Sequence, residues 1–324
     1  MRVLLVGLGR WGEKHLRVLR DLGVGLWVAD VSEERRRFAV RAGVDPARAV
    51  EDFRAALPHV DAVDLVTPAD NHLALASECL HAGRDCFVEK PLALTAAEGR
   101  RLADVVRRTG RILQVGHIFR FHPVTAALRE RLESGEVGPV RYGTGRFAGF
   151  KRPRTDVGVT MTDAIHYFDL FAHLLGRAPT AVTATLRDYL GRGLDDCSFS
   201  TVEYGGVPVV VEAGYFAPGT YRDCVIVGER QTLAADYATS ELRVHANRHV
   251  RGAAGWEAPE GAVEVLKASG PEPLRREIEL FLDAVARRGK PAVDVEAGLV
   301  ALRTVEAAQR SSALGRRVTL AELD

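Results

Sequence analysis

The first 120 or so residues alternate short apolar runs with segments of helical spacing. The runs are near-continuous rather than alternating, which is typical of a parallel sheet covered on both faces. They are VLLVG (3–7), LWVAD (26–30), DAVDLVTP (61–68), DCFVEKP (85–91) and RILQVGHI (111–118). Right-handed crossovers between such strands produce a doubly wound Rossmann domain. We therefore expect an α/β domain over residues 1–120.

Beyond residue 120 the pattern changes. Two helices are predicted at 122–135 and 158–176, and strand-like runs then follow one another with few helices between them. These runs lie at 180–190, 196–205, 207–216, 222–229, 232–237 and 241–246. The stretch 236–270 is expected to be partly loop, and two closing helices are predicted at 273–289 and 295–315. The pattern indicates an α+β domain over 121–324 with a mainly antiparallel sheet, whose closing helices can pack back on the first domain.

Composition narrows the possible functions. The chain is 47% hydrophobic and 27% charged, as in ordinary soluble enzymes, and its net charge of +1 creates no field that attracts nucleic acid or an anionic membrane. The N-terminus lacks a signal-peptide pattern, and no apolar run has the length of a membrane span. The four cysteines fit no zinc or disulfide framework. We expect a cytoplasmic protein without a metal, in which local charges hold any anionic ligand.

A glycine-rich loop lies between the first apolar run and the first helix. In this spacing the first glycine permits a tight turn, the second lets a pyrophosphate approach the backbone, and the third lets helix and strand pack closely. The N-terminus of the helix adds free N–H groups and a partial positive charge. We therefore assign dinucleotide binding to Gly7, Leu8, Gly9, Arg10, Trp11 and Gly12.

Asp30 closes the second apolar run. An acid about 20 residues beyond the glycine loop accepts hydrogen bonds from the ribose hydroxyls of NAD and repels a 2′-phosphate. The position therefore favours NAD over NADP as the cofactor. The arginines at 35–37 could soften this preference, but they lie a turn or more into a predicted helix, and we interpret them as its solvated face.

Four further stretches carry a family resemblance: TPADNH (67–72), VEKPLALT (88–95), GHIFRFHP (116–123) and DVGVTMTDAIHYFDL (156–170). With the glycine loop, they make the whole chain resemble the Gfo/Idh/MocA family of nicotinamide-dependent sugar and polyol oxidoreductases. The last two stretches are similar to the branch that oxidises the 3-hydroxyl of UDP-N-acetylglucosamine.

The resemblance implies roles for residues at the ends of two strands. Thr67, Pro68 and His72 would flank the cofactor, and Lys90, next to Glu89, would contact both the nicotinamide ribose and the reacting hydroxyl. It also implies a cis bond between Lys90 and Pro91. The chemistry agrees, because an ammonium at the carboxyl end of a strand lies where open α/β sheets bind ligands and can stabilise a developing alkoxide. The alternative is a surface lysine paired with Glu89.

His166 is the candidate base, since imidazole takes a proton near neutral pH. A helical wheel places Thr162, Asp163 and Asp169 within about 60° of it. The family carries an Asp four residues before this histidine, where the present chain has Thr162. Either Asp163 assists His166 and Thr162 touches substrate, or Thr162 orients the hydroxyl while Asp163 faces elsewhere. A lone histidine can also be an ordinary core residue.

A nucleotide-sugar diphosphate needs cationic donors. Arg120 and the basic loop with Lys151, Arg152 and Arg154 are the candidates, although a basic loop can equally be solvated. The sequence therefore predicts an NAD-dependent dehydrogenase that oxidises C3 of a UDP-N-acetylhexosamine. The alternatives are an inositol or simple monosaccharide dehydrogenase, and a non-catalytic NAD-binding regulatory protein. The resemblance further implies a homodimer or homotetramer formed through an open sheet face.

Overall fold

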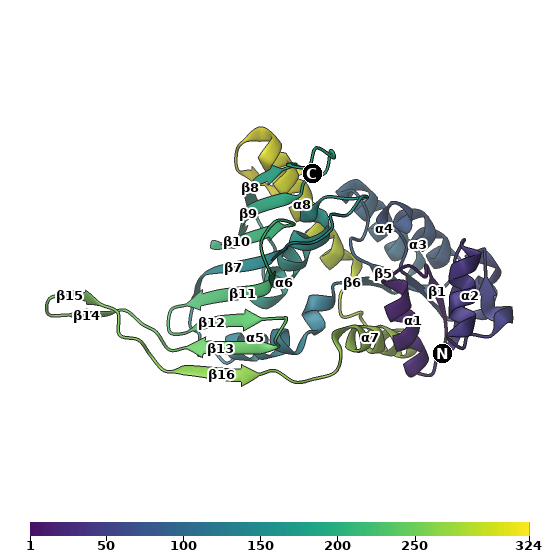
Figure 1. Cartoon of the computed structure of the whole chain (residues 1–324), viewed down its shortest axis with the longest axis horizontal. Coiled ribbons are helices and arrows are strands. Elements are labelled where there is room, and N and C mark those ends of the chain that lie inside the picture. The colour runs from purple at the N-terminus through teal and green to yellow at the C-terminus, as the bar shows by residue number, and fades with distance from the viewer. Residues whose placement is uncertain (324) are drawn as a thin grey trace. The chain divides into compact units, whose positions relative to one another are not determined.

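A computed structural model describes residues 1–323. The chain divides into two compact units. The first combines Met1–Ile118 with Glu272–Leu302, and the second combines Phe119–Pro271 with the chain from Arg303 onward. Each unit is built around one large sheet (Figure 1).

The first unit holds a six-stranded parallel sheet in the order β3-β2-β1-β4-β5-β6. This is the order of a doubly wound dinucleotide-binding fold, whose ligands bind at the carboxyl ends of the strands where the order reverses, between β1 and β4. The strands are β1 (Arg2–Val6), β2 (Gly25–Ala29), β3 (Ala49–Val50), β4 (Ala62–Leu65), β5 (Asp85–Glu89) and β6 (Leu113–Gly116). The predicted Rossmann fold is confirmed.

Helices cover both faces of this sheet. The helices are α1 (Gly12–Asp21), α2 (Glu33–Arg41), α3 (His72–His81), α4 (Ala96–Thr109) and α7 (Pro273–Arg287). Side chains of α1, α2 and α7 share one core with β1 and β2, while α3 and α4 lie side by side on the other face (Figure 1). Ser32 caps α2, and Thr95 with Glu98 forms a capping box that starts α4.

The second unit holds a nine-stranded sheet in the order β16-β13-β12-β11-β7-β10-β9-β8-β17. All neighbours are antiparallel except β7 and β10, so the sheet is mixed but mainly antiparallel, as predicted. Its strands are β7 (Val140–Gly149), β8 (Ala181–Arg187), β9 (Cys197–Tyr204), β10 (Val207–Gly214), β11 (Thr220–Gly228), β12 (Thr232–Asp236), β13 (Glu241–His245), β16 (Val263–Lys267) and β17 (Val318–Thr319).

Helices α5 (Pro123–Glu133) and α6 (Ile165–Leu175) pack on one face of this sheet, as does the end of α8 (Val295–Leu314), where Ser311 accepts a hydrogen bond from β8. The stretch 236–270 proves partly strand: besides β13 and β16 it contains a hairpin of β14 (Val250–Gly252) and β15 (Gly255–Glu257), which extends away from the sheet in Figure 1. Short 3₁₀ turns complete the chain at Pro46–Arg48, Phe53–Ala55, Leu57–His59, Ala69–Asn71, Ile118–Phe121 and Leu320–Leu323.

Strand β7 was not predicted from the sequence, although it lies near the middle of the sheet. Its glycines lower its strand propensity and hide its pattern. They are required by packing: a Cβ on Gly145 would lie 2.4 Å from the Tyr167 ring, and one on Gly143 would lie 2.8 Å from the Phe171 ring. The two rings of α6 therefore rest directly on the backbone of β7.

The predicted helix over 158–176 is not uniform. Thr160–Ala164 form a π-helical turn, and the α-helix α6 begins at Ile165. The α-helical wheel therefore does not describe the directions of Thr162 and Asp163, because a π turn holds more residues than an α turn. Single π turns inside helices often mark functional sites.

Candidate functional site

The glycine loop has the shape that a pyrophosphate needs. Gly7 has a φ of +93°, and a Cβ there would lie 2.5 Å from the carbonyl oxygen of Val66. A Cβ on Gly12 would lie 2.1 Å from the carbonyl oxygen of Gly7, whereas one on Gly9 would meet only open space. The first and third glycines thus allow tight packing, and the second leaves the backbone open to a ligand.

Asp30 is tied to this loop. One carboxylate oxygen accepts a hydrogen bond from the backbone N–H of Leu8 at 2.7 Å, and the other accepts from Ser32 N–H at 2.8 Å. A carboxylate has further lone pairs, so both oxygens can still accept from a ribose. The neighbouring arginines bond elsewhere: Arg35 to Glu13, and Arg36 to the carbonyls of residues 30 and 31.

The loops after β4 and β5 meet through His72. Its ring nitrogens lie 2.9 Å from the carbonyl oxygen of Pro91 and 3.0 Å from that of Thr67. Burial lowers the pKa of His72, so the neutral ring donates to one carbonyl at a time. The buried side chain braces the two loops. Beside it, the buried hydroxyl of Thr67 has no hydrogen-bond partner among residues 1–323, which leaves it available to a ligand.

The Lys90–Pro91 peptide is cis, as the resemblance implies. Glu89 ends β5 and accepts a hydrogen bond from Trp11 Nε1 at 2.7 Å and from the backbone N–H of Lys90 at 3.1 Å. Glu89 therefore connects the glycine loop to the strand end that carries Lys90. The open backbone at Gly9, the free Thr67 hydroxyl and this connected strand end together fit an NAD molecule.

In the second unit, His166 lies within a group of aromatic rings. It is 7% exposed, and its ring stacks with Phe119 at 4.8 Å and with Phe147 at 5.5 Å between centroids. Phe119 comes from the 3₁₀ turn before α5, and Phe147 comes from β7. Neither ring was singled out by the sequence analysis, because nothing in the sequence shows that these three segments converge.

Asp163 and Thr162 point to different partners. The carboxylate of Asp163 accepts a hydrogen bond from Lys151 Nζ at 2.6 Å, and Thr162 Oγ1 lies 3.3 Å from the hydroxyl of Tyr215. Asp195 starts the π turn by accepting hydrogen bonds from both the backbone N–H and the hydroxyl of Thr160. Polar groups thus gather around the first turn of the His166 helix, where sequence reasoning placed only Thr162 and Asp163.

The candidate phosphate-binding cations are mostly paired. Arg120 forms a two-bond ion pair with Asp169, at 2.8 and 2.5 Å, and Arg154 pairs with Asp156. Arg152 is exposed and forms no salt bridge with residues 1–323. The structure adds Arg222, whose guanidinium carbon lies 3.5 Å from the centre of the Phe147 ring, while Lys151 Nζ lies 4.6 Å from the same ring.

The three cations of this group differ in their pKa shifts. The pKa of Lys151 lies below its ordinary value, chiefly because of burial, and the charges of Arg222 and Arg154 lower it further against the opposing effect of Asp163. Burial also lowers the pKa of Arg222. The hydrogen bond to Asp156 instead raises the pKa of Arg154. Lys151 and Arg154 are each paired with a carboxylate, whereas Arg222 donates to the backbone carbonyl oxygens of residues 148 and 221, so Arg222 is the cation of this group best suited to an anionic ligand.

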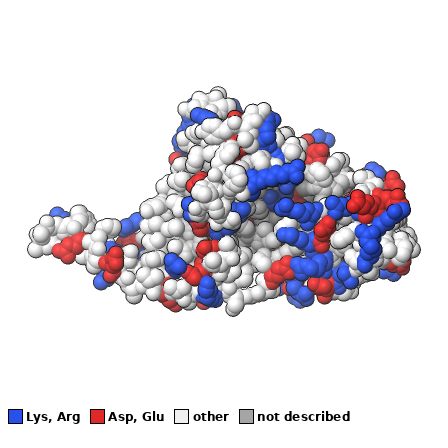
Figure 2. All heavy atoms as spheres, viewed as in Figure 1, with Lys and Arg blue, Asp and Glu red and all other residues white. Residues whose placement is uncertain are grey.

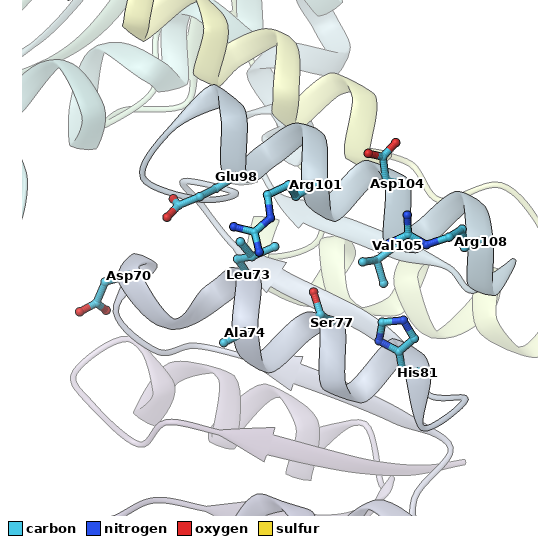
Figure 3. Close-up of a pocket in the computed structure, with 10 residues that line it drawn as sticks. All are labelled: Asp70, Leu73, Ala74, Ser77, His81, Glu98, Arg101, Asp104, Val105 and Arg108. Atoms are coloured by element: carbon cyan, nitrogen blue, oxygen red, sulfur yellow. The ribbon is translucent and has the colours of Figure 1, made fainter.

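A groove of about 590 Å³ lies on the outer side of the first unit, between α3 and α4 (Figure 3). Its lining mixes charges of both signs, among them Glu98, Arg101 and Asp104, and none of it comes from the glycine loop. On the face drawn in Figure 2, acidic and basic side chains are also interspersed. Within residues 1–323, no helix could cross a bilayer and no group of three or more acidic, histidine or cysteine side chains could hold a metal.

Comparisons with known proteins agree with both units. Residues 1–117 match the Gfo/Idh/MocA model described as an oxidoreductase family with an NAD-binding Rossmann fold, and residues 129–320 match that family's C-terminal alpha/beta domain. An inositol 2-dehydrogenase of Rhizobium meliloti (strain 1021) is 28% identical over 99% of each chain. A UDP-N-acetylglucosamine 3-dehydrogenase of Acidithiobacillus ferrooxidans is 29% identical over 92% of this chain and 93% of that relative.

A solved structure of UDP-N-acetylglucosamine 3-dehydrogenase from Acidithiobacillus ferrooxidans superposes with a TM-score of 0.83 at 25% identity, covering 96% of this chain and 97% of the other. The fold similarity therefore extends over nearly the whole of both chains.

Proposed function

This chain belongs to the Gfo/Idh/MocA oxidoreductase family and is an NAD-dependent dehydrogenase of the sugar and polyol type, and on that premise we propose that it oxidises C3 of a UDP-N-acetylhexosamine. The observation that carries the proposal is a group of three cations in the unit that holds His166: Lys151 and Arg154 are paired with carboxylates, and Arg222 donates to backbone carbonyl oxygens. A diphosphate would neutralise these cations through charge-assisted hydrogen bonds.

We assign the cofactor to the first unit. The glycine loop would hold the pyrophosphate, Asp30 the ribose hydroxyls, and Thr67 and Lys90 the part nearer the nicotinamide. Bound NAD supplies the acceptor for the hydride. Lys90 would stabilise the developing alkoxide, and its place is fixed by Glu89, which bonds its backbone N–H.

His166 would take the hydroxyl proton, directly or through Lys90 and water. The flanking rings of Phe119 and Phe147 hold the imidazole plane. We propose that Asp163 modulates His166 electrostatically while Thr162 touches substrate. Asp163→Asn should then shift the pH profile of kcat, whereas Thr162→Val should mainly raise KM; the reverse pattern would reassign the two residues.

A substrate screen tests this proposal. Purified protein and NAD are mixed in turn with UDP-GlcNAc, UDP-GalNAc, UDP-glucose, glucose and myo-inositol, and the formation of NADH is followed by its absorbance. We expect turnover of an N-acetylated UDP-sugar. Arg222→Gln should raise KM for that substrate about tenfold, since it loses a charged hydrogen bond. The matched control is Arg108→Gln on the exposed side of α4, which should change neither kcat nor KM.

The alternative is an inositol or monosaccharide dehydrogenase, favoured by the similarity to inositol 2-dehydrogenase and by the carboxylate partners of Arg120, Lys151 and Arg154. Good inositol turnover without UDP-sugar turnover, and an unchanged KM in Arg222→Gln, would establish that alternative. In either case Lys90→Ala should abolish turnover and keep measurable NAD binding; turnover like that of the wild type would remove Lys90 from the mechanism.

We also propose a homo-oligomer formed through the uncovered face of the nine-stranded sheet. Val210, Thr144 and Val225 lie side by side on that face in neighbouring strands, and Tyr142 and Phe199 are about half exposed at 46% and 49%. Exposed apolar side chains gathered on one sheet face are typical of a contact between subunits.

A further inference from the structure

A buried charged cluster lies beneath the glycine loop of the first unit. His15 is on the inner side of α1 and is 0% exposed, Asp64 in β4 is 2% exposed, and Glu89 at the end of β5 is 7% exposed. His15 Nδ1 lies 2.8 Å from an oxygen of Asp64, and Nε2 lies 3.2 Å from an oxygen of Glu89. The family resemblance and the proposed chemistry assign no role to His15 or Asp64.

Both ring nitrogens of His15 face a carboxylate oxygen. A neutral imidazole donates from one nitrogen only, so the geometry fits the doubly protonated cation. Burial opposes that charge, but the charges and hydrogen bonds of Asp64 and Glu89 outweigh burial and raise the pKa of His15 to about 10. The ring is therefore a buried cation at neutral pH.

The two carboxylates differ. Burial raises the pKa of Asp64, and one of its oxygens has no hydrogen-bond partner among residues 1–323. Burial also acts to raise the pKa of Glu89, but His15, the Trp11 donor and the charge of Lys90 together lower it. Glu89 is thus the member of the cluster that stays ionised most firmly.

Glu89 passes the effect of the cluster to the functional loops. The oxygen that faces His15 also accepts from Trp11 Nε1 at 2.7 Å, and the other oxygen accepts from the backbone N–H of Lys90 at 3.1 Å. Its space depends on Gly116, where a Cβ would lie 3.0 Å from the Glu89 carboxyl carbon. A single carboxylate therefore joins the glycine loop, α1 and Lys90.

We propose that His15 is a positioning residue for hydride transfer, which fixes the Glu89 carboxylate and, through it, both the glycine loop that holds NAD and the backbone of Lys90. The effect of His15 on Lys90 matters for catalysis only if the proposed function holds, so that part of the inference rests on it. The effect of His15 on the glycine loop requires only that the chain binds NAD. Buried ion pairs add little net stability compared with apolar residues of the same size, so a role in fixing geometry accounts better for this cluster.

The first test replaces His15 with Gln, which carries no charge and cannot donate to both carboxylates. We expect the Kd for NAD, measured by calorimetric titration well below the Tm, to rise about tenfold. We also expect kcat at saturating NAD to fall. His81→Gln, on the exposed side of α3, is the matched control and should change neither quantity. A purely structural role predicts a lower Tm with Kd and kcat within about twofold of the wild type, and that result would overturn the proposal.

Removing the cation leaves two buried carboxylates and can prevent folding, so a second variant keeps the test decisive. Trp11→Phe removes the indole N–H donor to Glu89, keeps an aromatic ring at that position and leaves the charges paired. It should weaken NAD binding with little change in Tm, and the effect should be smaller in the His15→Gln background, because both changes act through Glu89. NAD binding like that of the wild type in Trp11→Phe, or fully additive effects, would refute the coupling. If the wild type binds NAD but oxidises no sugar, the NAD titrations still test whether His15 fixes the glycine loop, and only the proposed substrate is refuted.

Discussion

At the scale of single residues, the sequence predicts groups that belong to short local motifs and misses groups that meet across the fold. The glycine loop, Asp30 and the Glu89-Lys90-Pro91 turn each follow a strand, so their places could be anticipated. His15 and Asp64 could not, because one lies within a helix and the other within an apolar strand, 49 residues apart. The available signal was a charged residue inside a buried strand, which requires a partner.

The raised pKa of His15 predicts how stability depends on pH. Because the pKa is about 10 in the folded protein and 6.5 in the unfolded chain, the stability that the cation contributes is fully present below pH 6.5 and is lost as the pH rises through 10. The difference in free energy of unfolding between the wild type and His15→Gln should therefore shrink from pH 7 to pH 10, by at most about 1.4 kcal/mol per pH unit. Urea unfolding at several pH values measures this, with His81→Gln as reference. A constant difference would show that His15 is neutral in the folded protein.

At the scale of elements, the spacing of apolar residues and the capping residues predicted most helices and strands. The elements that were not predicted depend on packing against distant parts of the chain. Strand β7 is rich in glycine because rings of α6 occupy the space that its side chains would need. The π turn before α6 depends on Asp195, which lies 35 residues beyond Thr160 and accepts two hydrogen bonds from it. Local pattern cannot anticipate either feature, because the deciding partner is distant in the sequence.

The contact between β7 and α6 gives a prediction about stability. Gly145→Val should displace the Tyr167 ring, since even a Cβ would lie 2.4 Å from it, and should lower the free energy of unfolding by about 1–3 kcal/mol. Thr144→Val, the adjacent position on the opposite side of the strand, should leave stability within about 0.5 kcal/mol of the wild type. Thermal and urea unfolding of the two variants compare them directly. Equal stability would mean that α6 does not rest on the backbone of β7.

At the scale of the molecule, the sequence indicated two sheets, the order of the elements and that the closing helices can pack back on the first domain, but not the sheet face that each helix covers. The first unit takes α7 from a distant part of the chain, and Phe281 of that helix packs edge-on against Phe87 of β5 at 5.8 Å. An amphipathic helix reveals which of its sides is buried, but not the sheet against which it is buried. The strand order of the second sheet, with β7 parallel to β10, was equally beyond local pattern.

The uncovered sheet face predicts the assembly state. Val210→Lys puts a charge beside Thr144 and Val225 on this face and should reduce the protein to monomers, because burying an unpaired ammonium at an interface is costly. Light scattering coupled to size exclusion measures the mass. His81→Lys, on the first unit, should leave the assembly intact. A wild type that is monomeric at all concentrations, or a Val210→Lys oligomer of unchanged mass, would contradict the proposed interface.

The discontinuous first unit has a consequence for synthesis on the ribosome. When residue 118 has emerged, all six of its strands exist, but the face that α7 covers is still bare, because residues 273–287 are translated more than 150 positions later. Phe87 and the apolar residues around it stay uncovered until most of the second unit has been translated. The nascent chain therefore exposes an apolar sheet face until α7 has been translated. Chaperones bind such surfaces, and a gene fragment that ends at residue 118 should yield aggregated protein.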